Sequence, residues 1–180
     1  MTSTRVATPR TRGIGSRLLA AGLLTAVVDG TFSSVLSAGF YHSTVARLFQ
    51  GVAGALLGPD AINGGARTVA VGMLMHLGVA FGWSAVFLGL LIASPRLRGV
   101  RASRGGALKV ASLYGPLVWM AMSLAVIPLL VHRPPAITIR WWVQFFGHIP
   151  FVALPIALGI GSDVPTAGFA AVPATDAGEA

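Results

Sequence analysis

Three titratable side chains stand inside long apolar runs of this sequence: Asp29, His76 and His148. Each run is long enough to cross the hydrocarbon of a bilayer as a helix, where a charged or titratable group costs at least about 2.5–3.5 kcal/mol. A residue kept at that cost is a candidate for carrying protons, holding an ion or ligating a cofactor. It also has a purely structural use, because polar side chains hydrogen-bond membrane helices to one another.

The depth and helical phase of these residues predict that they share the interior of one bundle. At about 1.5 Å per residue, His76 and His148 lie roughly 10–12 Å from the outer ends of their helices, and Asp29 lies near the midplane. Ser33 follows Asp29 by one turn, and Gln144 precedes His148 by one turn, so each pair shares a helix face. We therefore predict an intramembrane polar cluster of Asp29, Ser33, His76, Gln144 and His148.

The elements that must position this cluster are four long apolar stretches. A bilayer core about 30 Å thick needs roughly 20 apolar helical residues, and residues 18–41, 68–93, 109–131 and 141–161 satisfy that requirement. The chain is 54% hydrophobic and only 10% charged, whereas a soluble domain carries about 25% charged residues. The predicted fold class is all-α, a polytopic membrane protein with four transmembrane helices.

A shorter helix is predicted in the connection between the first two spans. Ser43 and Thr44 are good N-terminal caps, and the apolar residues that follow recur at helical spacing: Val45, Leu48, Phe49, Val52 and Leu56. Arg47 and Gln50 fall on the opposite side, and Gly58-Pro59 ends the pattern. We expect a short interfacial amphipathic helix, which either lies in the membrane interface or closes the bundle as a lid.

Composition divides the chain into one membrane domain and two terminal segments. Residues 1–17 and 162–180 are rich in Thr, Ala, Pro and Gly, which predicts a disordered N-terminus and a disordered tail around a four-helix domain at 18–161. The first apolar run has an alternative interpretation as a cleaved signal peptide. It is longer than the usual apolar region of about 7–15 residues and contains Asp29, so we interpret it as a spanning helix.

The basic residues predict the orientation of the bundle. Nine of the 13 Lys and Arg residues lie before the first helix or between the second and third, and four lie in the other connections. The positive-inside rule then places both termini in the cytoplasm, in the inner (cytoplasmic) membrane of a bacterium. The formal net charge of +8 is explained by this topology and by contact with anionic lipid, so we do not expect a nucleic-acid partner.

Several motifs carry a resemblance to known proteins. They are RLFQGVAGALLG at 47–58, NGGA at 63–66, GMLMHL at 72–77, LYG at 113–115, HIP at 148–150 and LPIAL at 154–158. Together they resemble a family of small uncharacterised bacterial four-helix integral membrane proteins. The resemblance spans roughly residues 15 to 161 and implies the fold, but it transfers no function. The chain departs from the family at Met122-Ser123, where Met-Asn is expected, so a role built on an amide there is in doubt.

The residue types leave several chemistries open and exclude others. The sequence contains no cysteine, which rules out disulfides, thiolate metal sites and iron–sulfur clusters within this chain. His76 and His148 are candidates for axial ligands of haem b, and with Asp29 they have the number of ligands of a catalytic zinc site. Ser84 stands in a G-x-S-x string but lies about 12 Å in depth from His76, too far for a nucleophile and its base.

The function expected from these features is not enzymatic. We predict a structural or accessory membrane protein, in a homo-oligomer or a larger membrane complex, with no cofactor. The first alternative is a small proton, cation or solute transport unit that uses Asp29, His76 and His148. The second alternative is a haem-binding or metal-binding membrane protein that uses the two histidines.

Overall fold

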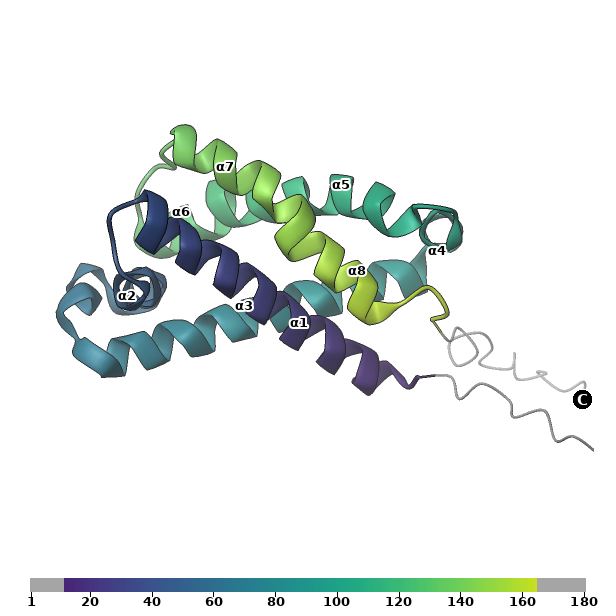
Figure 1. Ribbon diagram of the computed structural model, residues 1–180, viewed down its shortest axis with the longest axis horizontal. Helices are drawn as coiled ribbons and strands as arrows, with labels where there is room; N and C mark the ends of the chain where they lie inside the picture. Colours follow the sequence, from purple (N-terminus) through teal and green to yellow (C-terminus); the bar gives the residue numbers. More distant parts are fainter. Residues whose placement is uncertain (1–11, 165–180) are drawn as a thin grey trace, which may run out of the picture.

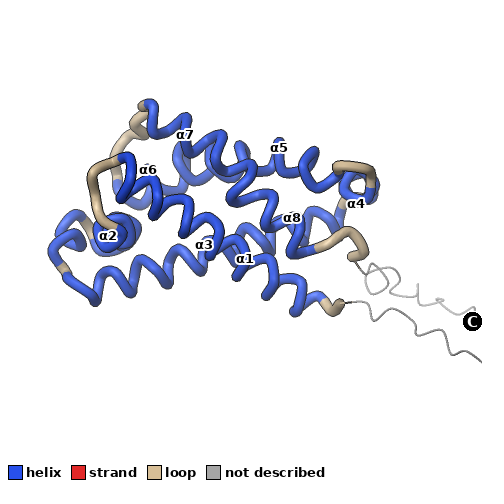
Figure 2. Tube along the Cα trace, viewed as in Figure 1, coloured by secondary structure: helices blue, strands red, loops and turns tan. Residues whose placement is uncertain are grey.

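The computed structural model describes residues 12–164, and the regular structure within that range is helical (Figures 1 and 2). Four helical spans are long and apolar enough to cross a membrane: Ile14–Phe40, Gly65–Ala93, Gly106–Val131 and Ile139–Ile160. The predicted all-α class with four transmembrane helices is therefore confirmed. The architecture is that of a multi-pass membrane protein.

Three of the four spans contain a wide π-helical turn, which ends the first span and interrupts the third and fourth. The first consists of α1 (Ile14–Val35) and a π turn at Leu36–Phe40, and the second is the continuous helix α3 (Gly65–Ala93). The third consists of α5 (Gly106–Met120), a π turn at Ala121–Val126 and α6 (Ile127–Val131). The fourth consists of α7 (Ile139–His148), a π turn at Ile149–Ala153 and α8 (Leu154–Ile160).

The terminal segments differ in part from the sequence prediction. Helix α1 begins at Ile14 rather than at Leu18, so residues 14–17 are helical. At the other terminus Asp163 accepts hydrogen bonds from Arg17, and Val164 is buried. The predicted disorder of residues 1–11 and 165–180 lies outside the described residues.

The helices run between two distinct ends of the bundle. Helix α2 (Val45–Leu57) and a 3₁₀ turn (Pro59–Asn63) join the first two spans at one end, and α4 (Pro95–Ala102) joins the next two at the other. The described termini lie at the α4 end (Figure 1). Helix α1 packs against both α3 and α8, and α5 packs against the fourth span. We call these ends the α2 end and the α4 end.

The short helix α2 is confirmed, but its buried face differs from the prediction. Thr44 caps it by accepting a hydrogen bond from the backbone N–H of Arg47 at 3.1 Å. Gln50 is buried rather than on a solvated face, because its amide donates to the carbonyl of Gly65 at the start of α3. The backbone of Phe49 lies so close to Gly72 that a side chain there has no room. Helix α2 is thus fastened to α3 like a lid.

The packed core occupies the α4 half of the bundle. Its buried residues come from all four spans and include Phe87, Leu91, Val118 and Ile156. Tyr114 fastens α5 to α3, since its hydroxyl donates to the carbonyl of Trp83 at 2.7 Å and its ring centroid lies 5.0 Å from that of Phe87.

One buried and two half-buried arginines hold the helix ends together at the α4 end. Arg17 is only 1% exposed, and it donates to the carbonyl of Ile160 at 2.6 Å and to both carboxylate oxygens of Asp163 at 2.9 and 3.1 Å. Arg98 donates to the carbonyls of Leu91 and Ile92, and Arg101 donates to the carbonyl of Ala157. These arginines, which the positive-inside rule uses to predict the orientation of the bundle, therefore also donate hydrogen bonds to carbonyls near helix C-termini.

The Arg17 contacts predict a large effect on stability. We expect Arg17→Ala to lower the free energy of unfolding by about 1–3 kcal/mol, because it leaves the buried carbonyl of Ile160 without its charged donor. Thermal unfolding in a mild detergent measures this. Arg104→Ala, which removes an exposed arginine from the same end, is the control, and equal stability of the two variants contradicts the prediction.

The same contacts predict a pH dependence. The hydrogen bond from Arg17 holds the pKa of Asp163 below its ordinary value, so the ionised carboxylate stabilises the folded protein at neutral pH. This contribution is lost as the pH falls through the lowered pKa. We expect Asp163→Asn to be less stable than wild type at pH 7 and equally stable well below the lowered pKa. A difference that persists unchanged in acid contradicts this origin.

Candidate functional site

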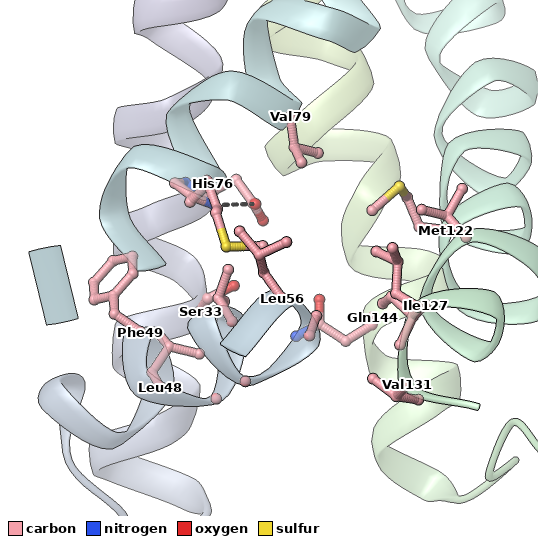
Figure 3. A pocket seen from close by; sticks show the side chains of 18 of the residues that line it. Ser33, Leu48, Phe49, Leu56, His76, Val79, Met122, Ile127, Val131 and Gln144 are labelled. Atoms are coloured by element: carbon pink, nitrogen blue, oxygen red, sulfur yellow. Dashed lines mark ion pairs between the residues drawn. The ribbon is translucent and has the colours of Figure 1, made fainter. Parts of the chain in front are cut away.

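A large cavity lies between the spans in the α2 half of the bundle. Its volume is about 940 Å³, and all four spans and α2 contribute to its lining. Figure 3 shows Leu56 and Phe49 of α2 on one side, facing Met122, Ile127 and Val131 of the third span on the other. Most of the wall is apolar, with polar groups at a few positions.

The cavity begins where the packed core ends. Tyr114 holds α3 and α5 together near Trp83, and Trp83 and Val118 are among the first residues that line the cavity beyond this contact. The π turns at Ala121–Val126 and Ile149–Ala153 lie in the two spans beside it. Pro128, Pro150 and Pro155 lie in or just after these turns, and proline cannot donate the usual helical hydrogen bond. Such wide turns alter the direction of a helix locally.

All five residues of the predicted polar cluster line this cavity: Asp29, Ser33, His76, Gln144 and His148. They come from α1, α3 and α7, so tertiary packing brings three separate spans to one space. Asp29 and His76 lie close to each other, whereas no direct contact joins either of them to His148 among the described residues. The site therefore has a carboxylate–imidazole side and a second imidazole.

Asp29 and His76 join α1 to α3. His76 Nδ1 lies 3.8 Å from Asp29 Oδ2, which is longer than a hydrogen bond. His76 Nε2 lies 3.0 Å from the carbonyl oxygen of Ala26, and because a carbonyl only accepts, Nε2 carries the hydrogen. The imidazole is thus fixed on α1 by one nitrogen and presents the other to the carboxylate. Gly30 leaves room for the ring, since a Cβ there lies only 3.3 Å from Nε2.

His148 is held in a different way. Its Nδ1 lies 2.7 Å from the carbonyl oxygen of Gln144 one turn earlier, so Nδ1 carries the hydrogen and Nε2 of the neutral ring is an acceptor. The ring packs on Trp119 with centroids 4.8 Å apart. Its backbone lies against Gly115, where a Cβ would come within 2.6 Å of the His148 carbonyl oxygen. This close approach holds the fourth span against α5, and the Gln144 and Trp119 contacts hold the ring beside the cavity.

Three polar atoms along the cavity wall are buried and have no hydrogen-bond partner among the described residues: Thr25 Oγ1, Asp29 Oδ1 and Trp119 Nε1. Buried polar groups are normally paired, so a group of unpaired ones in one place points to a partner outside the chain. Sequence reasoning did not include Thr25 and Trp119 in the site. The sequence nevertheless contains an indication for each residue. Thr25 precedes Asp29 by one turn and shares its helix face, and the indole N–H of Trp119 needs a hydrogen-bond partner in hydrocarbon.

The geometry limits the metal and haem alternatives. No three His, Cys, Asp or Glu residues within residues 12–164 are grouped so that they could hold a metal ion, so the three-ligand zinc site is not formed there. For a haem ligated through two Nε2 atoms, His148 has the right hydrogen-bond pattern. His76 has the opposite pattern, because its Nε2 is already occupied by the Ala26 carbonyl. The pair does not fit symmetric axial ligation.

Two serines flagged in the sequence have structural partners. Ser84 is fully buried and donates to the carbonyl of Ala80 at 2.7 Å. Ser123 accepts a hydrogen bond from Trp141 Nε1 at 3.0 Å, which joins the third and fourth spans.

Comparison with known proteins adds no relative: no family model matches the chain, and no significant match is found among curated proteins or solved structures.

The Asp29–His76 geometry predicts energetic coupling. In a double-mutant cycle of Asp29→Asn and His76→Gln, we expect a coupling energy of about 0.5–3 kcal/mol in unfolding free energy, because the two groups face each other inside the bundle. Chemical unfolding in detergent measures the four proteins of the cycle. A parallel cycle of Asp29→Asn with His132→Gln, whose imidazole lies at the α2 end after α6, is the control. Coupling within error of zero for the first cycle contradicts the pairing.

Proposed function

We propose that this protein is a non-enzymatic accessory protein of the bacterial cytoplasmic membrane, and that it binds a small, mostly apolar molecule inside its helix bundle. The observation that carries this proposal is the cavity of about 940 Å³ between the four spans. Binding sites for small molecules are typically cavities of about 300–1,000 Å³ with apolar walls and a few convergent polar groups. The cavity has this size and this distribution of groups.

The polar wall supports binding over a purely structural role for the cluster. A structural cluster satisfies its own members, as Tyr114 does with Trp83 and as Trp141 does with Ser123. Along the cavity, by contrast, Asp29 Oδ1 and Trp119 Nε1 have no partner among residues 12–164. A bound molecule that supplies a donor and an acceptor satisfies both atoms.

Helix α2 supports the proposal as the closing element. It crosses the end of the bundle in Figure 1, and its residues Leu48, Phe49 and Leu56 line the cavity. Its attachment to α3 through Gln50 and the Phe49 backbone places this lid over the space between the spans.

A second candidate function is transport of a proton, a cation or a solute. One observation favours it: the Asp29 carboxylate faces the His76 imidazole at 3.8 Å, and the His148 ring lines the same cavity. Titratable groups at membrane depth commonly mark proton or ion paths. In this function the cavity forms part of a path across the membrane, and a second copy of the chain supplies the rest of the path in a dimer.

The arginines of the α4 end support a cytoplasmic location for both termini and contact with anionic lipid. Arg96 and Arg104 are exposed there, beside the termini, as the positive-inside rule expects for the cytoplasmic side. Fusion of a reporter to the C-terminus tests this. We expect alkaline phosphatase, active only outside the cytoplasm, to be inactive there and active when inserted after Arg133. The opposite pattern contradicts the orientation.

The binding proposal predicts saturable uptake of a neutral apolar probe. We expect 1-bromonaphthalene to quench tryptophan fluorescence of the purified protein with a saturating component, because Trp83 and Trp119 line the cavity. Val79 also lines it (Figure 3), so Val79→Phe should weaken the saturating component about tenfold by filling space.

The matched control is Val86→Phe, which adds the same ring two turns along α3, outside the cavity lining. It should bind the probe like wild type. Quenching that rises linearly with probe in all three proteins reflects partition into detergent alone, and that result rejects the binding proposal.

A further inference from the structure

The acid at the cavity wall has no equivalent elsewhere in the spans. The chain has five acidic residues, and Asp29 is the one within the four spans, since Asp60 lies in the 3₁₀ turn and Asp163 follows α8. Protein donors satisfy its carboxylate only in part: Ser33 contributes a side-chain hydrogen bond, His76 Nδ1 is 3.8 Å away, and Oδ1 has no partner among the described residues. A carboxylate in apolar surroundings is costly unless an opposite charge pairs with it closely.

Aromatic rings surround the space that this carboxylate faces. Phe49, Trp83, Trp119 and the His148 imidazole all line the same cavity. The faces of such rings attract cations, most strongly where water is excluded. The neutral His148 ring adds an acceptor, because its Nδ1 is the atom that donates to the Gln144 carbonyl.

The other charged and titratable groups around the cavity are compatible with a cation beside Asp29. His76 faces Asp29 from α3, and His148 lies on the fourth span. His132 and Arg133 also line the cavity, but they follow α6 at its mouth and are exposed. Asp29 precedes the end of its span at Phe40 by 11 residues, which corresponds to about 16 Å along the axis. Arg133 is exposed near that end and forms no ion pair with Asp29 among the described residues, so its guanidinium is hydrated there.

From these observations we infer that the molecule bound in the cavity is a lipophilic organic cation, whose positive centre pairs with Asp29 and whose apolar groups contact the aromatic wall. The inference rests on the proposed binding function and names its ligand class. An apolar cation fits because its bulky substituents fill the cavity and it is weakly hydrated. An anion is disfavoured by the carboxylate. A neutral acceptor fits Trp119 Nε1 but leaves Asp29 Oδ1 without a partner.

The test compares two probes of similar size and rings that differ in charge. Tetraphenylphosphonium is a permanent lipophilic cation, and triphenylphosphine oxide is a neutral hydrogen-bond acceptor. Equilibrium dialysis against the full chain in mild detergent measures saturable binding of each. We expect the cation to bind wild type about tenfold or more tightly than the oxide, because only the cation gains the charge pair with Asp29.

Variants locate the effect. Asp29→Asn keeps the shape of the side chain and should reduce cation affinity about tenfold or more while leaving the oxide unaffected. Asp60→Asn makes the same charge change at an exposed position of the α2 end, outside the cavity lining, and should bind both probes like wild type. Asp29→Glu retains the charge and should retain preference for the cation.

The outcomes separate this inference from the binding proposal. If the oxide binds wild type as tightly as the cation, or if a folded Asp29→Asn binds the cation like wild type, the inference is wrong. If 1-bromonaphthalene still binds saturably in that case, the cavity proposal stands. If none of the three probes binds saturably, both are wrong. The comparison of probes on wild type decides the inference even where Asp29→Asn does not fold.

Discussion

Every polar side chain buried within the four spans must find its hydrogen-bond partner in the protein, in enclosed water or in a bound molecule, because hydrocarbon offers none. The rest of this structure follows from how that constraint is met. Tyr114 bonds to the Trp83 carbonyl, Trp141 bonds to Ser123, and each interior histidine bonds to a main-chain carbonyl. All of these bonds except that of His148, which stays within α7, connect different spans. Apolar packing alone would not distinguish one arrangement of the helices from another, since lipid tails are as apolar as the helix surfaces.

The two halves of the bundle satisfy their buried polar groups in different ways. In the α4 half, small residues allow close approach, with Gly159 directly against Ala21, and arginines satisfy helix carbonyls. In the α2 half, α3 and the third span are separated by a cavity, and the buried polar atoms without partners include Asp29 Oδ1 and Trp119 Nε1. One half is therefore a packed scaffold, and the other half is the part of the molecule suited to receive a ligand.

The division also explains the placement of α2. An open end of the cavity would expose a wide apolar surface, and α2 covers part of it while remaining fastened to α3 by Gln50. The amphipathic pattern predicts this helix and its cap correctly. It misplaces Gln50 on the solvated face, because a glutamine that donates to a buried carbonyl is indistinguishable in the pattern from one that faces water.

The amino-acid sequence is enough to predict the fold class, the four spans and the short helix, because span length and apolar periodicity are local properties that the bilayer dictates. It also indicates the candidate residues Asp29, His76 and His148, since titratable groups are conspicuous in apolar runs. The packing of the helices is needed to show which of them meet, that His76 and His148 use opposite ring nitrogens, and that Thr25 and Trp119 join the site. These facts depend on helix rotation and on wide turns at Ala121–Val126 and Ile149–Ala153. Packing between distant segments sets both, and no single segment encodes it.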